Sequence, residues 1–144
     1  MLSAASPESI DYTQYKDSIQ IDREDSSEAI SYAAIDAAYS LKAKAIICFT
    51  SSGSTALRAA RFRPGIPIIA ITQSEEVARQ LSITFGIIPI KTGFFPNTDE
   101  MIEDAKRMLT GAGLAKNGDT FVITAGNPAG IAGNTNMLKI INID

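Results

Sequence analysis

Residues 43–72 read AKAIICFTSSGSTALRAARFRPGIPIIAIT and contain a complete strand–helix–strand unit. The apolar run 45–49 has the length of a strand, and the polar turn 50–55 separates it from a helical pattern that ends before Pro64. A second apolar run, 66–72, has the length of the next strand. Strands joined through a helix lie parallel, with a right-handed crossover. This stretch therefore predicts an α/β fold.

Three further helices are predicted from signals at their N-termini. A capping box at Asp25 and Glu28 indicates the first, Ser74 is the expected N-cap of the second, and Asn97 that of the third. Helical spacing then predicts which residues face the core. These residues are Ile30, Ala34, Ala37 and Leu41 in the first helix and Met101, Ala105, Met108 and Ala112 in the third.

Three more strands are predicted at 86–92, 119–126 and 137–143. The first two follow helices, which favours parallel pairing with helices on both faces of the sheet. The last follows a loop that is short and has no helical pattern, so it should run antiparallel. Residues 25–144 are therefore expected to form one α/β domain, and 1–24 a polar linker or lead-in.

Composition excludes several classes of chemistry. The 144 residues include no His and one Cys, which rules out a Ser-His-Asp triad, a His-ligated zinc site, a four-Cys metal site and an internal disulfide. The first residues lack the basic and apolar regions of a signal peptide, and no window approaches the about 18 apolar residues of a membrane span. A cytoplasmic protein without membrane contact is expected.

Charge is segregated along the chain. Eight acids against two bases give −6 over 1–36, two against seven give +5 over 37–95, and six against four give −2 over 96–144, for a total of −3. A basic middle segment in an acidic protein favours a local anion site. The acidic total argues against a nucleic-acid partner.

The turn between the first strand and its helix has the composition of a phosphate cradle. It consists of Thr50, Ser51, Ser52, Gly53, Ser54 and Thr55. Hydroxyls donate to phosphate oxygens, Gly permits close backbone approach, and the next helix offers free N–H groups with a partial positive charge. The turn matches neither a Walker A loop nor a Rossmann fingerprint. The alternative is an ordinary strand-to-helix turn whose Ser and Thr cap the helix.

Three arginines follow this turn, namely Arg58, Arg61 and Arg63. Arg58 and Arg61 share a helix face because they are three residues apart. Added positive potential for an anion is one interpretation. A solvated face or an intersubunit salt bridge is favoured, since exposed basic residues contribute little.

A second loop leaves the fourth predicted strand and is rich in Gly. It consists of Gly126, Asn127, Pro128, Ala129, Gly130, Ile131, Ala132, Gly133 and Asn134. If the first and fourth strands are parallel, this loop leaves the same sheet edge as turn 50–55, where ligands of such sheets bind. It is either a flap that closes over a ligand or a wide turn into the last strand.

Two further features are interpreted as structural. Cys48 lies in an apolar strand and is expected to be a small buried hydrophobe rather than a reactive thiol. Four carboxylates gather at a predicted helix start, where they complement the helix dipole. They are Asp99, Glu100, Glu103 and Asp104. No catalytic residue and no metal ligand is expected in this chain.

These motifs together resemble the C-terminal domain of pyruvate kinase. Members of that family carry a T-x-S-G-x-[ST] turn, a helix, and then [KR]-[YF]-R-P-x-x-P-I-[IL]-A-[VI]-T, which match 50–55 and 61–72 here. They also carry G-D before a strand, T-[AG]-G after it and a later T-N pair, here Gly118-Asp119, Thr124-Ala125-Gly126 and Thr135-Asn136. The resemblance covers residues 9–143.

The resemblance implies a three-layer α/β/α domain with a five-stranded mixed sheet whose last strand is antiparallel. It implies a domain that does no chemistry, binds a phosphorylated sugar or AMP as allosteric effector, and contributes to a homotetramer. The effector phosphate would lie in the 50–55 turn, on the hydroxyls of Thr50, Ser52 and Thr55 and the N–H of Gly53. The loop 126–130 would fold over it. The catalytic barrel of the full enzyme, with Mg²⁺ and K⁺, would transfer the phosphoryl group from phosphoenolpyruvate to ADP.

Two departures from the family pattern matter. The barrel is absent from these 144 residues, so no catalysis is expected from them alone. Eukaryotic members of the family hold the second phosphate of a bisphosphate with a basic residue or a Trp. This chain has no Trp, and 126–134 contains no Lys or Arg, which favours a monophosphate or an unknown effector. The alternatives are a freestanding paralogue or an oligomerisation module with a vestigial phosphate pocket. The helix over 29–38 and the final strand would then be its contact surfaces.

Overall fold

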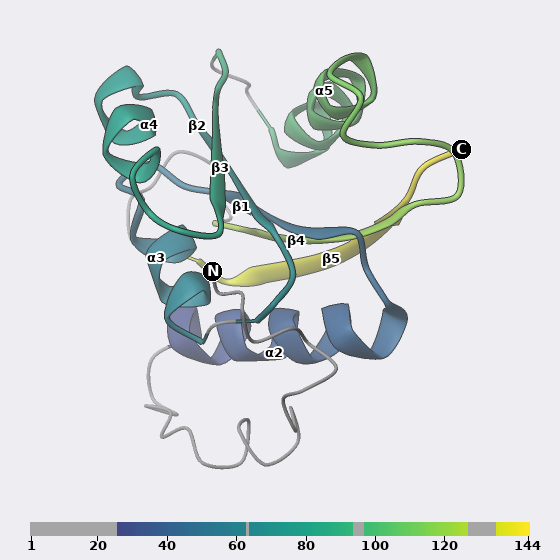
Figure 1. The fold of residues 1–144 in the computed structure, drawn as a ribbon, viewed down its shortest axis with the longest axis horizontal. Coiled ribbons are helices and arrows are strands. Elements are labelled where there is room, and N and C mark those ends of the chain that lie inside the picture. The colour runs from purple at the N-terminus through teal and green to yellow at the C-terminus, as the bar shows by residue number, and fades with distance from the viewer. Residues whose placement is uncertain (1–25, 63, 94–96, 127–134) are drawn as a thin grey trace.

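The computed structural model describes residues 26–62, 64–93, 97–126 and 135–144 (Figure 1). Helices and strands alternate along most of the chain, as the sequence predicts. In order they are α2 (Ser26–Leu41), β1 (Ala45–Phe49), α3 (Ser54–Arg61), β2 (Ile68–Thr72), α4 (Glu75–Leu81), β3 (Ile87–Lys91), α5 (Thr98–Gly111), β4 (Thr120–Ala125) and β5 (Met137–Asn142). The predicted lead-in, 1–24, lies outside the described residues.

The five strands form one mixed sheet in the order β3-β2-β1-β4-β5. β1 pairs in parallel with β2 and with β4, and β2 pairs in parallel with β3. β5 is antiparallel to β4, which confirms the prediction made from the short loop before it. The central strand β1 is buried along its whole length, and this explains its uninterrupted apolar sequence.

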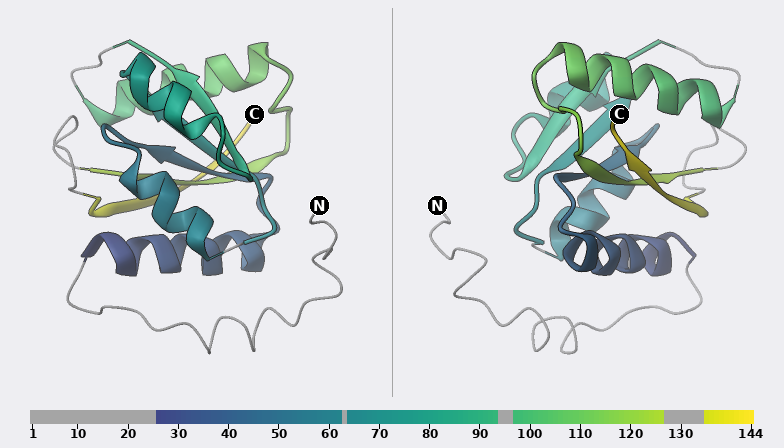
Figure 2. Two further views of the ribbon diagram at one scale, coloured as in Figure 1. Left: turned by 60° about the vertical axis from the view of Figure 1, so that its left-hand side comes forward. Right: turned by 90° about the vertical axis from the view of Figure 1, so that its right-hand side faces the viewer.

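Helices cover both faces of the sheet, so the predicted three-layer arrangement is confirmed. Figure 2 shows α2 and α3 on one side and α5 on the other. On the first side, Ile35, Cys48 and Phe62 belong to one buried cluster, which Leu81 of α4 joins. On the second side, Ile102 and Leu109 of α5 pack against β-strand residues such as Phe121. Each face of the sheet therefore has its own core, and the parallel strands, with their carboxyl ends, lie between these two cores.

The buried stripe of α2 differs from the prediction. Ala34 is buried as expected, whereas Ile30 and Ala37 are half-buried and Leu41 is exposed. The side chains that face the sheet are those of Ser27, Ser31, Ala34, Ile35 and Ala38. Small residues occur on several sides of this helix, so the apolar spacing does not define its rotation. The packing of α2 against the sheet defines this rotation.

The stripe of α5 is also rotated from the prediction. Ala105 is buried as expected, but the residues buried with it are Ile102 and Leu109. Met101 and Met108 are half-buried at the flank of this core, and Ala112 is exposed at the C-cap. Two stripes that share Ala105 are possible in this sequence, and the structure places the branched side chains against the sheet.

The predicted helix starts are confirmed where the structure describes them. Ser74 Oγ accepts the N–H of Val77 at 3.1 Å, and Asn97 Oδ1 accepts the N–H of Glu100 at 2.9 Å. Asp25 of the proposed capping box lies outside the described residues. The helical sequence that begins at Ser74 was expected to cover 74–85, but α4 ends at Leu81, and Phe85 is 81% exposed. None of the described helices is long and apolar enough to cross a lipid bilayer.

Candidate functional site at the carboxyl ends of β1 and β4

The candidate site lies where the order of the strands reverses. β1 is followed by a crossover to β2 on one side, whereas its other neighbour, β4, is reached through α5 on the opposite face. Ligands of doubly wound sheets bind at such a point, outside the carboxyl ends of the strands. Turn 50–55 and Gly126 follow the ends of β1 and β4, so the expected common edge is confirmed. Residues 127–134 of the second loop, including the predicted Asn127, Pro128, Ala129 and Gly130, lie outside the described residues.

The hydroxyl-rich turn is closed by its own side chains. Thr50 Oγ1 accepts the N–H of Gly53 at 2.8 Å. Ser52 Oγ accepts the N–H of Ser54 at 3.3 Å and donates to Ser54 Oγ at 3.1 Å. These bonds hold the backbone in a tight turn directly before α3.

Gly53 is required at its position for two reasons. Its φ of +90° lies in the left-handed region that residues with a side chain rarely adopt. A Cβ built on it would lie 3.3 Å from Val77 Cγ1 and 3.4 Å from a Leu81 Cδ atom. Gly53 therefore also lets α4 pack closely against the turn.

The turn presents different groups to solvent and to the protein interior. Ser51 and Ser52 are exposed and Ser54 is half-buried, whereas Thr50 and Thr55 are buried. Gly53 is the N-cap of α3 and has no side chain to cap the first N–H groups of the helix. The solvent side of the turn therefore combines serine hydroxyls with the positive end of a helix, which is a favourable environment for an anion. That these residues contact a phosphate stays a prediction.

A buried hydroxyl pair lies behind the turn. Thr55 Oγ1 is 2.6 Å from Thr135 Oγ1, and either atom can be the donor. Thr135 is the first described residue after the second loop, and Ser27 Oγ donates to its carbonyl oxygen at 3.5 Å. Thr135 is not one of the site residues that the sequence predicted. The T-N pair that it forms with Asn136 is the sequence signal that could have identified it.

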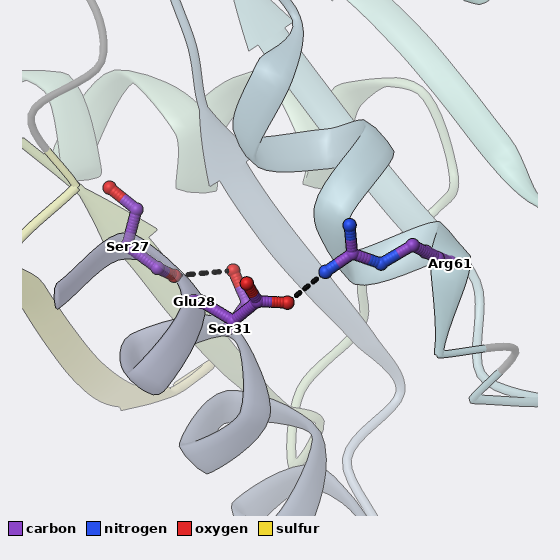
Figure 3. Close-up of polar contacts among 4 residues, drawn as sticks. All are labelled: Ser27, Glu28, Ser31 and Arg61. Atoms are coloured by element: carbon purple, nitrogen blue, oxygen red, sulfur yellow. Dashed lines mark hydrogen bonds and ion pairs between the residues drawn. The ribbon is translucent and has the colours of Figure 1, made fainter. Parts of the chain in front are cut away.

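Arg61 connects two helices rather than approaching the turn. It forms an ion pair with Glu28 of α2, as Figure 3 shows. In the same view, Ser31 Oγ donates to the carbonyl oxygen of Ser27 at 2.9 Å. The guanidinium carbon of Arg61 also lies 5.8 Å from the ring centre of Phe62. The partner of Arg61 is thus within this chain. Arg58 is half-buried, and Arg63 lies outside the described residues.

The four carboxylates lie in the first half of α5, the helix on the face of the sheet opposite α2 and α3. Asp104 accepts a hydrogen bond from Thr92 Oγ1 at 3.2 Å and is 3.3 Å from Arg107. Glu103 is 3.3 Å from Lys106. Asp99 and Glu100 lie in the first turn of the helix, where they complement its dipole. Over the described ranges, no three His, Cys, Asp or Glu side chains gather as a metal ion would require.

Cys48 is fully buried in β1, as expected for a small hydrophobic residue. Burial raises the pKa of its thiol to about 11, and the neighbouring Thr124 hydroxyl opposes this rise. Thr124 Oγ1 is itself buried and has no partner of normal hydrogen-bond geometry among the described residues. A protonated, enclosed thiol is a poor nucleophile.

The fold and the site define a doubly wound α/β domain with a hydroxyl-rich turn at its switch point. The chain belongs to the family described as "Pyruvate kinase, alpha/beta domain", whose model matches residues 28–141. It is 44% identical over 117 residues to a pyruvate kinase of Clostridium perfringens and 41% identical over 119 residues to that of Clostridium acetobutylicum. It is 43% identical over 112 residues to a pyruvate kinase of Staphylococcus aureus strain USA300.

These matches cover most of this chain but a small part of each relative. The matches to the enzymes of Clostridium perfringens, Clostridium acetobutylicum and Staphylococcus aureus include 81%, 83% and 78% of this chain, respectively. The matched part is 25%, 25% and 19% of the relatives. The chain therefore spans about a quarter or less of the length of the pyruvate kinases that it matches.

Proposed function

We propose that this chain is the regulatory domain of a pyruvate kinase and binds a phosphorylated effector at turn 50–55. The observation that carries the proposal is the position of this turn at the switch point of the sheet, where exposed serine hydroxyls meet the start of α3. A phosphate there would accept a hydrogen bond from Ser51, and one from Ser52 when the Ser52 proton turns from Ser54 Oγ to the phosphate. The N–H groups of the first helical turn, other than that of Ser54, which Ser52 Oγ already accepts, would add to these bonds.

The charge distribution supports an anionic ligand of modest charge. Residues 37–95, which include the turn and α3, carry the net charge of +5 in an otherwise acidic chain. Turn 50–55 itself contains no Lys or Arg. A phosphomonoester of a sugar, or AMP, suits such a site better than a bisphosphate, because one phosphate has a cradle and a second has no cationic side chain in the turn.

Phosphoryl transfer would belong to the rest of the enzyme. The relatives are pyruvate kinases, and this chain matches about a quarter or less of each. The 144 residues contain no His, and we expect no pyruvate from phosphoenolpyruvate and ADP when they are assayed alone. In the proposed full enzyme, effector binding here would alter activity through contacts with other domains and subunits.

Calorimetry with ribose 5-phosphate, AMP and fructose 1,6-bisphosphate tests the proposal. Ser52→Ala should weaken binding about 10- to 100-fold, since a hydrogen bond to a charged group contributes about 1.5–3 kcal/mol. Ser40→Ala is the matched control, because Ser40 is an exposed serine on α2 and lies outside the turn. Absence of binding by the wild-type chain, or equal binding by Ser52→Ala, would contradict the proposal.

A second candidate function is subunit assembly through β5. This strand lies at the edge of the sheet, and Ile140 on it is 44% exposed. The opposite edge strand, β3, contains Pro89, which has no N–H to donate to another strand. β5 has no proline, although the exposed Lys139 on it opposes pairing, and an open strand edge is a template for pairing with a second copy. Sedimentation with and without phosphorylated ligands separates this role from effector binding.

A further inference from the structure

The hydroxyl pair behind the turn joins segments that are far apart in the sequence. Thr55 and Thr135 are 80 residues apart, yet their hydroxyl oxygens are 2.6 Å from each other. Thr55 is 4% exposed and Thr135 is 3% exposed. Within the part of the chain that the structure describes, these two hydroxyls are each other's partner, and both are shielded from water, so losing either one would leave the other without this bond.

Thr135 is held by elements on more than one side. Its hydroxyl meets α3, and its carbonyl oxygen accepts from Ser27 Oγ of α2 at 3.5 Å. The next residue, Asn136, donates its N–H to the carbonyl oxygen of Ala125, the last residue of β4, at 3.2 Å. Hydrogen bonds to α2 and, through Asn136, to β4 therefore hold Thr135 in place, and the first turn of α3 is hydrogen-bonded to it.

The attachment bears directly on the phosphate turn. Thr55 is the second residue of α3, and turn 50–55 leads into that helix. The Thr55 hydroxyl is buried and paired with Thr135, so this bond is one of the contacts that hold the first turn of α3, and with it the first N–H groups of the helix. An anion site made from backbone N–H groups depends on their placement within about 0.5 Å.

We propose that Thr135 is a positioning residue for the phosphate site, acting through Thr55. The inference rests on the proposed effector function and assigns a role to a residue on the far side of the second loop. A hydroxyl donates one hydrogen bond and accepts others. Thr135 can thus donate to Thr55 Oγ1 and leave the Thr55 proton available to the adjoining turn, without either oxygen losing its partner.

The test compares Thr135→Val, which removes the hydroxyl and keeps the shape, with Thr135→Ser, which keeps the hydroxyl. Calorimetry uses the full 144-residue chain with ribose 5-phosphate, AMP and fructose 1,6-bisphosphate, at a temperature where circular dichroism shows each variant folded. Thr135→Val should raise the Kd of whichever ligand binds at least fivefold, and Thr135→Ser should stay within twofold of wild type. Thr120→Val is the control, because the Thr120 hydroxyl also pairs with a side chain, Asn142, at 2.8 Å but at the opposite end of β4.

Each outcome decides a different question. If the wild-type chain binds none of the three ligands, the effector function fails and this inference falls with it. If the wild type binds and Thr135→Val binds equally well, only the positioning role is overturned, even when that variant melts at a lower temperature. If Thr135→Val does not fold, Thr55→Val removes the same hydrogen bond from the other side, and an unchanged Kd there overturns the inference as well.

Discussion

Gly53 illustrates how a single residue position connects the turn to its surroundings. From the sequence, the role of this glycine was to let a ligand approach the backbone. The structure adds a second role, which is to avoid a clash with α4. A side chain there would need a φ of +90° and would crowd Val77 and Leu81 of α4. The turn motif explains why a glycine is needed for the backbone conformation, whereas its close approach to α4 could not be predicted from the sequence.

Gly53→Ala should lower the free energy of unfolding by more than the backbone strain alone. The left-handed conformation costs about 1–2 kcal/mol for a residue with a Cβ, and the contact with Val77 adds to it. Gly118→Ala is the control, because Gly118 has a similar φ of +94° and nothing within 4 Å of its Cβ position. Urea unfolding measures both variants. Equal losses would show that packing against α4 contributes nothing.

Because of Cys48, we expect the free energy of unfolding to fall as the pH becomes alkaline. The folded protein holds the pKa of this thiol at about 11, above its ordinary value of 9.0, because burial disfavours the thiolate. The folded state therefore keeps the proton more tightly than the unfolded state. Its contribution to stability is complete below pH 9 and is lost as pH rises through 11, with a slope of at most about 1.4 kcal/mol per pH unit.

The measurement is the free energy of unfolding at pH 8, 9 and 10, in wild type and in Cys48→Ala. The wild type should lose stability from pH 9 to 10 more steeply than the variant, whatever the cost of the substitution itself. Burial also raises the pKa of Tyr39, from 10.0, so the comparison ends at pH 10 to limit that contribution. Parallel curves for the two proteins would contradict the assignment to Cys48.

At the scale of elements, strands and caps were predictable and helix rotation was not. β1 and β2 are short, wholly buried apolar runs bounded by polar turns, so their position follows from local sequence. The rotation of α2 and α5 about their axes depends on which side chains fit the sheet. Both helices contain more than one possible apolar stripe, and only packing selects between them.

The N-cap of α4 offers a test at this scale. Ser74 Oγ accepts the N–H of Val77, so Ser74→Ala should cost about 1 kcal/mol of stability. Ser82→Ala is the control at the other end of α4, where the exposed hydroxyl donates to a carbonyl oxygen, and we expect a smaller loss there. Thermal unfolding in both variants measures the difference. An equal loss would mean that the Ser74 hydroxyl does not cap the helix.

At the scale of the whole molecule, the two edges of the sheet are unlike. Both edges have an exposed isoleucine, Ile88 on β3 and Ile140 on β5, but β3 contains Pro89, whereas β5 has no proline and carries Lys139. If copies of the chain assemble through β5, Ile140→Lys should shift sedimentation toward the monomer, because charged side chains on an edge oppose strand pairing. Ile83→Lys is the control, since Ile83 is 89% exposed in the connection between α4 and β3. A wild-type monomer at all concentrations would exclude this assembly.

The sequence alone determined the alternation of strands and helices, the antiparallel last strand, the N-caps Ser74 and Asn97, and the family to which the turn 50–55 points. These features follow from local spacing, loop length and residue type, which a linear sequence displays directly. Only the tertiary structure decided the rotation of α2 and α5, the direction in which each hydroxyl of the turn faces, and the pairing of Thr55 with Thr135. These depend on contacts between residues far apart in the chain, where small differences in side-chain fit select one arrangement from several that the local sequence permits.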